Sequence, residues 1–227
     1  MIGRELKRIL QKPTAFVCIV VYMGIMILGV ESDLRARYEI GFLNLFWVTE
    51  NFGVTIFIQT LIFPVAAAGN YFDERKGHYD WLIQMLSGQL RYCIAKIVSA
   101  VLGGIILYMI SVILFFAVCV IFIPEVRHGS TVESITNLFQ SKECFWYRMA
   151  LSIGYYPTVI VLAFQYSLHI GIYVLLGLCV SVFCTNRYVF YAMPFLLTRI
   201  GMYIGGFVGL YAYIPYGREL LADGGWG

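Results

Sequence analysis

Four polar residues inside long apolar runs are the first candidates for chemistry in this sequence. Glu50 and Gln59 share one run, whereas His169 and Arg199 each interrupt another. Polar side chains at membrane depth are costly unless they meet protein or water, so they are candidates for a transport path. A count of about 1.5 Å per helical residue places Gln59, His169 and Arg199 near one level. By the same count Glu50 lies roughly 15 Å nearer the outside, and we do not expect it to contact them.

Two interpretations of this level of Gln59, His169 and Arg199 stay open. The first is a hydrogen-bonded layer that fixes the register of the helices, because buried polar groups are usually hydrogen-bonded. The second is the polar lining of a substrate path that opens to water from one side. Arg199 requires one of the two, because at roughly 17 Å from the inner end its side chain cannot reach fully back to the interface.

No motif of an ATPase, a zinc peptidase or a serine hydrolase occurs in the chain. The motifs sought are Gly-x4-Gly-Lys-Ser/Thr, His-Glu-x-x-His and Gly-x-Ser-x-Gly. None of the six cysteines belongs to a Cys-x-x-Cys pair, and the three histidines fall on three different segments. We therefore expect no catalytic residue, bound cofactor or metal site in this chain. Energy for transport would come from a partner or from an ion gradient.

The composition is that of a polytopic membrane protein. Hydrophobic residues make up 60% of the chain, charged residues only 13%, and the mean hydropathy is +0.79. Soluble proteins carry about 25% charged residues. A transmembrane helix needs about 20 apolar residues, so 227 residues hold five or six spans and leave no room for a separate soluble domain. We expect an all-α membrane protein with the lipid bilayer as its surroundings and no nucleic-acid partner.

The apolar runs predict one transmembrane domain with five spans. A basic amphipathic segment, residues 1–12, comes first and should lie in the plane of the membrane interface, because its Lys and Arg share one helical face and its apolar residues the other. The predicted spans that follow are residues 15–30, 45–71, 97–123, 157–184 and 188–214.

The distribution of Lys and Arg predicts that the N-terminus lies in the cytoplasm. With this orientation, nine of these residues fall in cytoplasmic segments and six in outer ones. Cytoplasmic loops of membrane proteins carry an excess of Lys and Arg. We therefore expect a multi-pass protein of the cell membrane with a cytoplasmic N-terminus.

A charged island, residues 73–90, separates the second and third predicted spans. Charged residues crowd its start at residues 73–76, and apolar residues follow at the i, i+3, i+4 and i+7 spacing of one helical face. Gly88 can take the left-handed conformation that ends a helix. We expect a short amphipathic helix at the membrane surface. The alternative is a loop that only links two spans.

Several sequence motifs follow one another in an order that resembles a known family. They are Arg4-Glu-Leu-Lys-Arg8, Phe63-Pro-Val-Ala-Ala-Ala68, Phe72-Asp-Glu-Arg-Lys-Gly77 running into Trp81-Leu82, Arg91-Tyr-x-x-Ala-Lys96, Leu176-Gly-Leu-Cys-Val-Ser-Val-Phe183 and Met193-Pro194. With this layout the chain resembles the permease subunit of ABC-2 type ABC transporters, exporters of Firmicutes in particular. The resemblance covers most of the chain.

The resemblance implies a transporter with two kinds of partner. The island would be a coupling helix docked on a cytoplasmic ATP-binding subunit, which holds ATP and Mg²⁺, and a second permease subunit would complete a homo- or heterodimer. Substrate would then move, in the export direction, by alternating access. The docking residues would be Asp73, Glu74, Arg75, Gly77, Tyr79, Leu82, Ile83 and Leu86.

Three glycines on the fifth predicted span form a small-residue stripe. Gly201, Gly205 and Gly209 make two overlapping Gly-x3-Gly steps, and small residues let helices approach closely in lipid. We expect a helix–helix contact there, either within the chain or at the dimer seam, and the resemblance favours the seam. Members of the family usually have six spans, so the resemblance leads us to expect a truncated product or a partial re-entrant element over residues 205–221.

Two other function classes stay open. An ion-coupled secondary transporter or small channel would show internal repeats and paired acids in the membrane, whereas Glu50 is the one acid predicted within a span. A membrane enzyme or a structural membrane protein would be the third class. An enzyme would need a set of catalytic side chains at one depth.

Overall fold

The protein is almost entirely helical. In the computed structural model the described residues are 2–35, 42–51, 53–76, 88–122, 145–184 and 186–207. These residues form α-helices and no strand, which confirms the predicted all-α class. The helices are α1 (Ile2–Leu10), α2 (Pro13–Arg35), α3 (Phe42–Asn51), α4 (Gly53–Lys76), α6 (Gln89–Phe122), α8 (Phe145–Ile153), α9 (Tyr155–Phe183) and α10 (Arg187–Phe207).

Four of these helices are long and apolar enough to cross a membrane, as expected of a multi-pass membrane protein. The candidate spans are Pro13–Val30 in α2, Val54–Arg75 in α4, Leu90–Phe122 in α6 and Tyr155–Phe183 in α9. The fifth predicted span, residues 188–214, coincides with α10 as far as Phe207. A fifth crossing therefore stays a prediction.

The described helices differ from the predicted second span in two places. The run 45–71 falls on two helices, because α3 ends at Asn51 and α4 begins at Gly53. At its other end α4 continues to Lys76, so residues 73–76 extend the spanning helix and do not begin a separate surface helix. Gly88 has a φ of +80°, as expected for a helix stop, and residues 77–87 before it lie outside the described residues.

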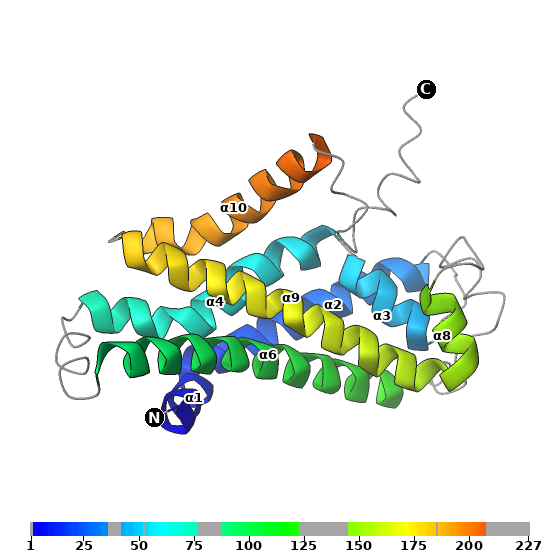
Figure 1. The fold of residues 1–227 in the computed structure, drawn as a ribbon. Helices are drawn as coiled ribbons and strands as arrows, with labels where there is room; N and C mark the ends of the chain where they lie inside the picture. The colour runs from blue at the N-terminus through cyan, green and yellow to red at the C-terminus, as the bar shows by residue number, and fades with distance from the viewer. Residues whose placement is uncertain are drawn as a thin grey trace.

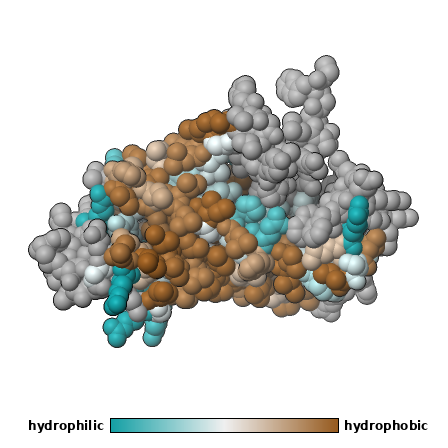
Figure 2. Space-filling model, viewed as in Figure 1, coloured by the Kyte–Doolittle hydropathy of each residue, from teal (hydrophilic) through white to brown (hydrophobic). Residues whose placement is uncertain are grey.

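The long helices lie side by side along the bundle (Figure 1). α9 packs against both α4 and α6, while α10 lies against α4 and α9. The short amphipathic α1 crosses α6 and ends where Pro13 begins α2, since proline is favoured in a first helical turn and not in a helix interior. Figure 2 shows that hydrophobic side chains cover most of the described surface on the face drawn, as expected of helices that face lipid.

Glycines let the spanning helices approach closely. A Cβ built on Gly104 of α6 would lie 2.6 Å from Val174 of α9, and one on Gly177 of α9 would lie 2.9 Å from the Cβ of Pro64 in α4. Real Cβ contacts are essentially never this short, so no other residue fits without movement. The sequence predicted close helix packing at small residues of α10, and the structure shows such packing between α9 and its neighbours α4 and α6.

The predicted glycine stripe on α10 has a different setting. Gly201 is exposed, and a Cβ there would meet nothing within 4 Å. Gly205 lies in α10 without a described environment, and Gly209 lies outside the described residues. Among the described residues nothing packs at the Cβ position of Gly201, and a contact with a second subunit stays a prediction.

We expect Gly177→Leu to lower the free energy of unfolding by about 1–3 kcal/mol, because the added side chain forces α9 away from α4. The matched control is Gly24→Leu on α2, where a Cβ would meet nothing within 4 Å. Its effect should stay within about 0.5 kcal/mol. Denaturant unfolding of the detergent-solubilised protein measures both. Equal losses for the two variants would contradict the close approach of α4 and α9.

Candidate functional site

A buried polar cluster around Glu50 joins four helices. The Glu50 carboxylate accepts hydrogen bonds from the Tyr22 and Tyr108 hydroxyls, each at 2.9 Å, and from the Gln59 carboxamide at 2.5 Å. The Gln59 carboxamide also donates to the Tyr22 hydroxyl oxygen at 2.6 Å. These side chains come from α2, α3, α4 and α6, and all are buried. The cluster therefore fixes the four helices against one another.

The contact between Glu50 and Gln59 corrects our expectation that Glu50 lies too far from that level. In one continuous helix nine residues would separate the two by roughly 13 Å along the axis. The helix break between Asn51 and Gly53 removes this separation, because α3 packs back against α4 as well as against α2 and α9, which lets the two side chains meet. Asn51 and Gly53, which flank the break, are poor helix formers.

Aromatic rings enclose the Glu50 cluster. The Tyr22 ring lies 5.2 Å from the Phe63 ring and 5.8 Å from the Tyr108 ring, measured between centroids, and Phe63 and Tyr108 are 5.9 Å apart. Hydrogen bonds are electrostatically stronger in such apolar surroundings than in water. Three neutral donors thus hold one acidic side chain in place.

His169 and Arg199 make contacts of another kind. His169 Nδ1 lies 2.9 Å from the carbonyl oxygen of Gln165, one turn earlier in α9. The Arg199 guanidinium lies over the Phe195 ring, 5.5 Å from its centroid, which is a cation–π geometry within α10. Each of these contacts lies within one helix, whereas Gln59 of α4 donates hydrogen bonds to side chains of α2 and α3. A common layer of Gln59, His169 and Arg199 stays a prediction.

A second buried carboxylate, Glu74, fastens α1 to α4 and α6. Lys96 Nζ lies 2.7 Å from Glu74 Oε2 and 2.5 Å from Glu5 Oε2, so one ammonium bridges α4 and α1. Arg8 of α1 pairs with the other Glu74 oxygen, and the Tyr92 hydroxyl donates to Oε2 at 3.3 Å. The side chains of Glu74 and Lys96 expose only 4% and 6% of their surface. Buried charges are tolerated when they are paired and hydrogen-bonded in this way.

Neighbouring ion pairs connect the same end of α4 to α2, α9 and α10. Asp73 accepts a hydrogen bond of 2.6 Å from Arg187, the first residue of α10, and lies 3.6 Å from Lys12 before α2. The Asp73 hydrogen bond and its charge raise the pKa of the Arg187 guanidinium. Arg75 donates to the carbonyl oxygen of Ser181 at 2.7 Å, near the end of α9, where carbonyls lack helical partners.

The residues expected to dock on an ATP-binding subunit have unequal settings. Glu74 faces the interior of the bundle and is not available to a partner. Asp73 is exposed and Arg75 half-buried, both engaged as described above. The others fall outside the described residues: Gly77, Tyr79, Leu82, Ile83 and Leu86.

Sequence reasoning missed the partners of both carboxylates. Tyr22 and Tyr108 lie in apolar runs, where a tyrosine resembles an ordinary packing residue. For Glu74 a signal existed: Lys96 begins the apolar part of α6, and Arg8 lies on an amphipathic α1 that must rest on the bundle. A metal-based alternative has no basis among the described residues, where no group of three His, Cys, Asp or Glu side chains is placed to hold an ion.

No family model matches the chain, and no curated protein or solved structure is significantly similar to it. The function is therefore inferred from the two carboxylate clusters and from the way the helices carry them.

We expect Glu50→Leu to lower the free energy of unfolding by about 2–4 kcal/mol, because two buried hydroxyls and an amide lose their acceptor. Combining Glu50→Leu with Tyr22→Phe and Tyr108→Phe should recover part of this loss, since the orphaned hydroxyls are then absent. Unfolding in detergent measures both. The three side chains would not act together if the triple variant had a lower free energy of unfolding than Glu50→Leu by the sum of the losses that Tyr22→Phe and Tyr108→Phe each cause alone.

Proposed function

We propose that this chain is the membrane-spanning permease subunit of an ABC-2 type transporter. A separate cytoplasmic subunit would bind and hydrolyse ATP, and the chain itself would carry no catalytic site. Its α10 would form a fifth span, and the exposed face at Gly201 would meet a second permease subunit.

The observation that carries this proposal is the position of the Glu74 cluster, which consists of Glu74 and its partners Lys96, Arg8 and Tyr92. It lies at the end of α4 and the start of α6, which we call the two roots of the charged island. Within the island, residues 73–90, α4 ends at Lys76 and α6 begins at Gln89. Glu74 lies two residues before the end of α4, and Lys96 lies two turns after the start of α6. Their ion pair, completed by Arg8, joins these two roots to α1.

This arrangement suits the transmission of force from a docked subunit. A displacement of the island acts first on the ends of α4 and α6, and the Glu74 cluster carries it to α1 because its members are buried and mutually bonded. Asp73 and Arg75 extend the connection to the first residue of α10 and to the end of α9. Five helices, α1, α4, α6, α9 and α10, are thus connected at this end of the bundle. We call the side chains that connect them, those of Glu74, Lys96, Arg8, Asp73, Arg75 and Arg187, the charged joint.

The charge at this end supports a cytoplasmic location. Basic side chains gather around the joint from α1, α4, α6 and α10, and segments rich in Lys and Arg stay in the cytoplasm. The basic residues that the ion pairs and hydrogen bonds place there are Arg8, Lys12, Arg75, Lys96 and Arg187.

Glu50 favours a second candidate function, an ion-coupled secondary transporter. An acid inside a membrane protein often takes part in proton or ion transport. The two candidates differ in their energy source: substrate uptake into vesicles would follow ATP for the permease and a pH gradient for the alternative. We favour the permease because the charged joint ties the end of α4 to the start of α6, the two helix ends next to the expected docking segment. A proton-driven carrier has no docking segment and does not require this connection.

We expect Leu82→Asp to abolish the association of the chain with an ATP-binding subunit, because a charge would enter the apolar face that fills the partner's groove. The matched control is Gln84→Asp, which adds the same charge on the opposite face of the predicted helix. Affinity purification of the tagged chain from its native membranes, with identification of a P-loop protein by mass spectrometry, measures the association. The absence of such a protein, or equal amounts with both variants, would contradict the proposal.

A further inference from the structure

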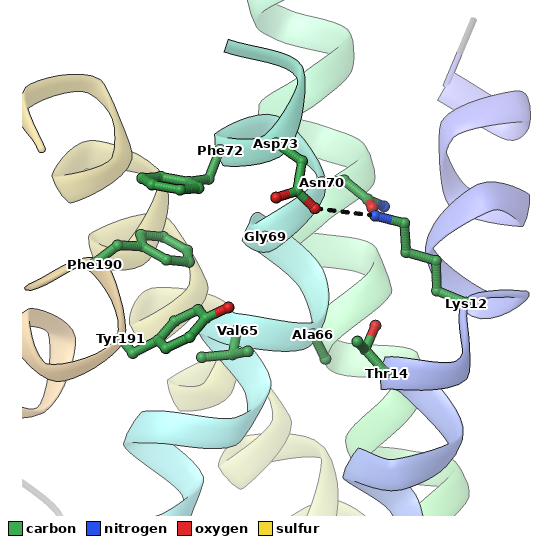
Figure 3. A pocket seen from close by; sticks show the side chains of 10 residues that line it. All are labelled: Lys12, Thr14, Val65, Ala66, Gly69, Asn70, Phe72, Asp73, Phe190 and Tyr191. Carbon is green, nitrogen blue, oxygen red and sulfur yellow. Dashed lines mark ion pairs between the residues drawn. The ribbon is translucent and has the colours of Figure 1, made fainter. Parts of the chain in front are cut away.

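A small pocket lies on α4 between the start of α2 and the start of α10 (Figure 3). Its floor is open because Gly69 has no side chain and a Cβ there would meet nothing within 4 Å. The cavity measures about 50 Å³, room for on the order of four water molecules. Its lining has the apolar side chains Val65, Ala66, Phe72 and Phe190 and the polar groups of Lys12, Thr14, Asn70, Asp73 and Tyr191.

Asn70 is the polar side chain of this pocket that needs an explanation. It is 5% exposed, and neither its amide nitrogen nor its amide oxygen has a hydrogen-bond partner. A buried amide without partners costs about 1–3 kcal/mol, so such groups in native proteins are normally met by water, an ion or a ligand. Asn70 lines the pocket together with Lys12 and Asp73, whose ion pair Figure 3 marks.

The charges at the rim favour an anion. Among the lining residues Lys12 and Asp73 carry opposite charges and lie 3.6 Å apart. Arg187, which is outside the lining, also pairs with Asp73 at 2.6 Å, so the three side chains together carry one positive charge. The Lys12 ammonium and the Asn70 amide can then donate to one tetrahedral anion, and the Thr14 hydroxyl lies on the same wall.

The surroundings favour an anion that carries acyl chains. Beside Lys12 and Thr14, the next residues of α2 include the exposed apolar side chains Phe16 and Val17. On the far wall α10 exposes Val189, the residue before the pocket residue Phe190. A charged pocket with exposed apolar surface next to it along the helices matches a lipid at the membrane interface, whose headgroup would enter the pocket and whose acyl chains would lie on the apolar surface.

We propose that this pocket binds the phosphate group of a membrane phospholipid, with Asn70 and Lys12 as donors and the acyl chains along α2 and α10. The lipid belongs to the leaflet on which α1 lies. It bridges α2, α4 and α10 beside the charged joint, and its binding requires no ATP-binding subunit. The site is thus independent of the proposed transport function.

Native mass spectrometry of the full-length chain in detergent, titrated with dihexanoylphosphatidylglycerol, tests this site. Binding should saturate, and Asn70→Leu should weaken it about tenfold or more, since an amide donor to a charged oxygen is lost. Lys12→Gln, at a partly exposed position that does not endanger folding, should weaken it in the same direction. The matched control is Gln165→Leu on α9, whose buried amide oxygen also has no partner.

The outcomes separate the sources of phosphate. Loss of lipid binding in Asn70→Leu and Lys12→Gln, with full binding in Gln165→Leu, supports the site. If inorganic phosphate alone binds as tightly as the lipid, the lipid assignment is overturned in favour of a free phosphate. If neither probe saturates, or if Asn70→Leu binds lipid like the unaltered chain, the pocket holds water only and the proposal fails.

Discussion

The carboxylate of Glu74 is the group on which the arrangement of the bundle depends most. It is buried at the end of α4 and would be strongly unfavourable there alone, because an unpaired charge loses its hydration. Lys96 and Arg8 supply the compensating charges, and this requirement holds α1 against α4 and α6. An amphipathic helix that could drift along the membrane surface is thereby fixed at one place, beside both roots of the charged island.

Glu50 is also a buried acidic side chain that needs polar partners, but its partners are neutral. Its three hydrogen bonds come from tyrosine hydroxyls and a carboxamide, and they draw α2, α3, α4 and α6 together. The end of α3 at Asn51 and the start of α4 at Gly53 make this possible, since one straight helix would hold Glu50 and Gln59 apart. The two clusters therefore secure different levels of the same bundle, and α4 and α6 contribute to both.

The sequence was sufficient to predict elements that depend on local pattern. Apolar runs located α2, α6 and α9, and helical periodicity together with Pro13 located α1. Features that depend on tertiary contacts were not predictable: Tyr22 and Tyr108 become hydrogen-bond donors only because Glu50 lies opposite them. The helix break between Asn51 and Gly53 had only the weak local signal of these two poor helix formers. Depth counting failed at Glu50 because it assumes a straight helix, and Glu74 looked like a surface charge because its partners come from distant segments.

The central claim is that Glu74 and Lys96 act as one buried pair joining the roots of the island, and a double-mutant cycle tests it most directly. Unfolding free energies would be measured for Glu74→Gln, Lys96→Met and the double variant. Each single change should cost up to about 3–5 kcal/mol, because it removes one of the two ion-pair partners of a buried charge: Lys96 keeps only Glu5, and Glu74 keeps only Arg8. The double variant should lose less than the sum by at least about 1 kcal/mol. Strictly additive losses would contradict the claim, because the two side chains would then be acting independently.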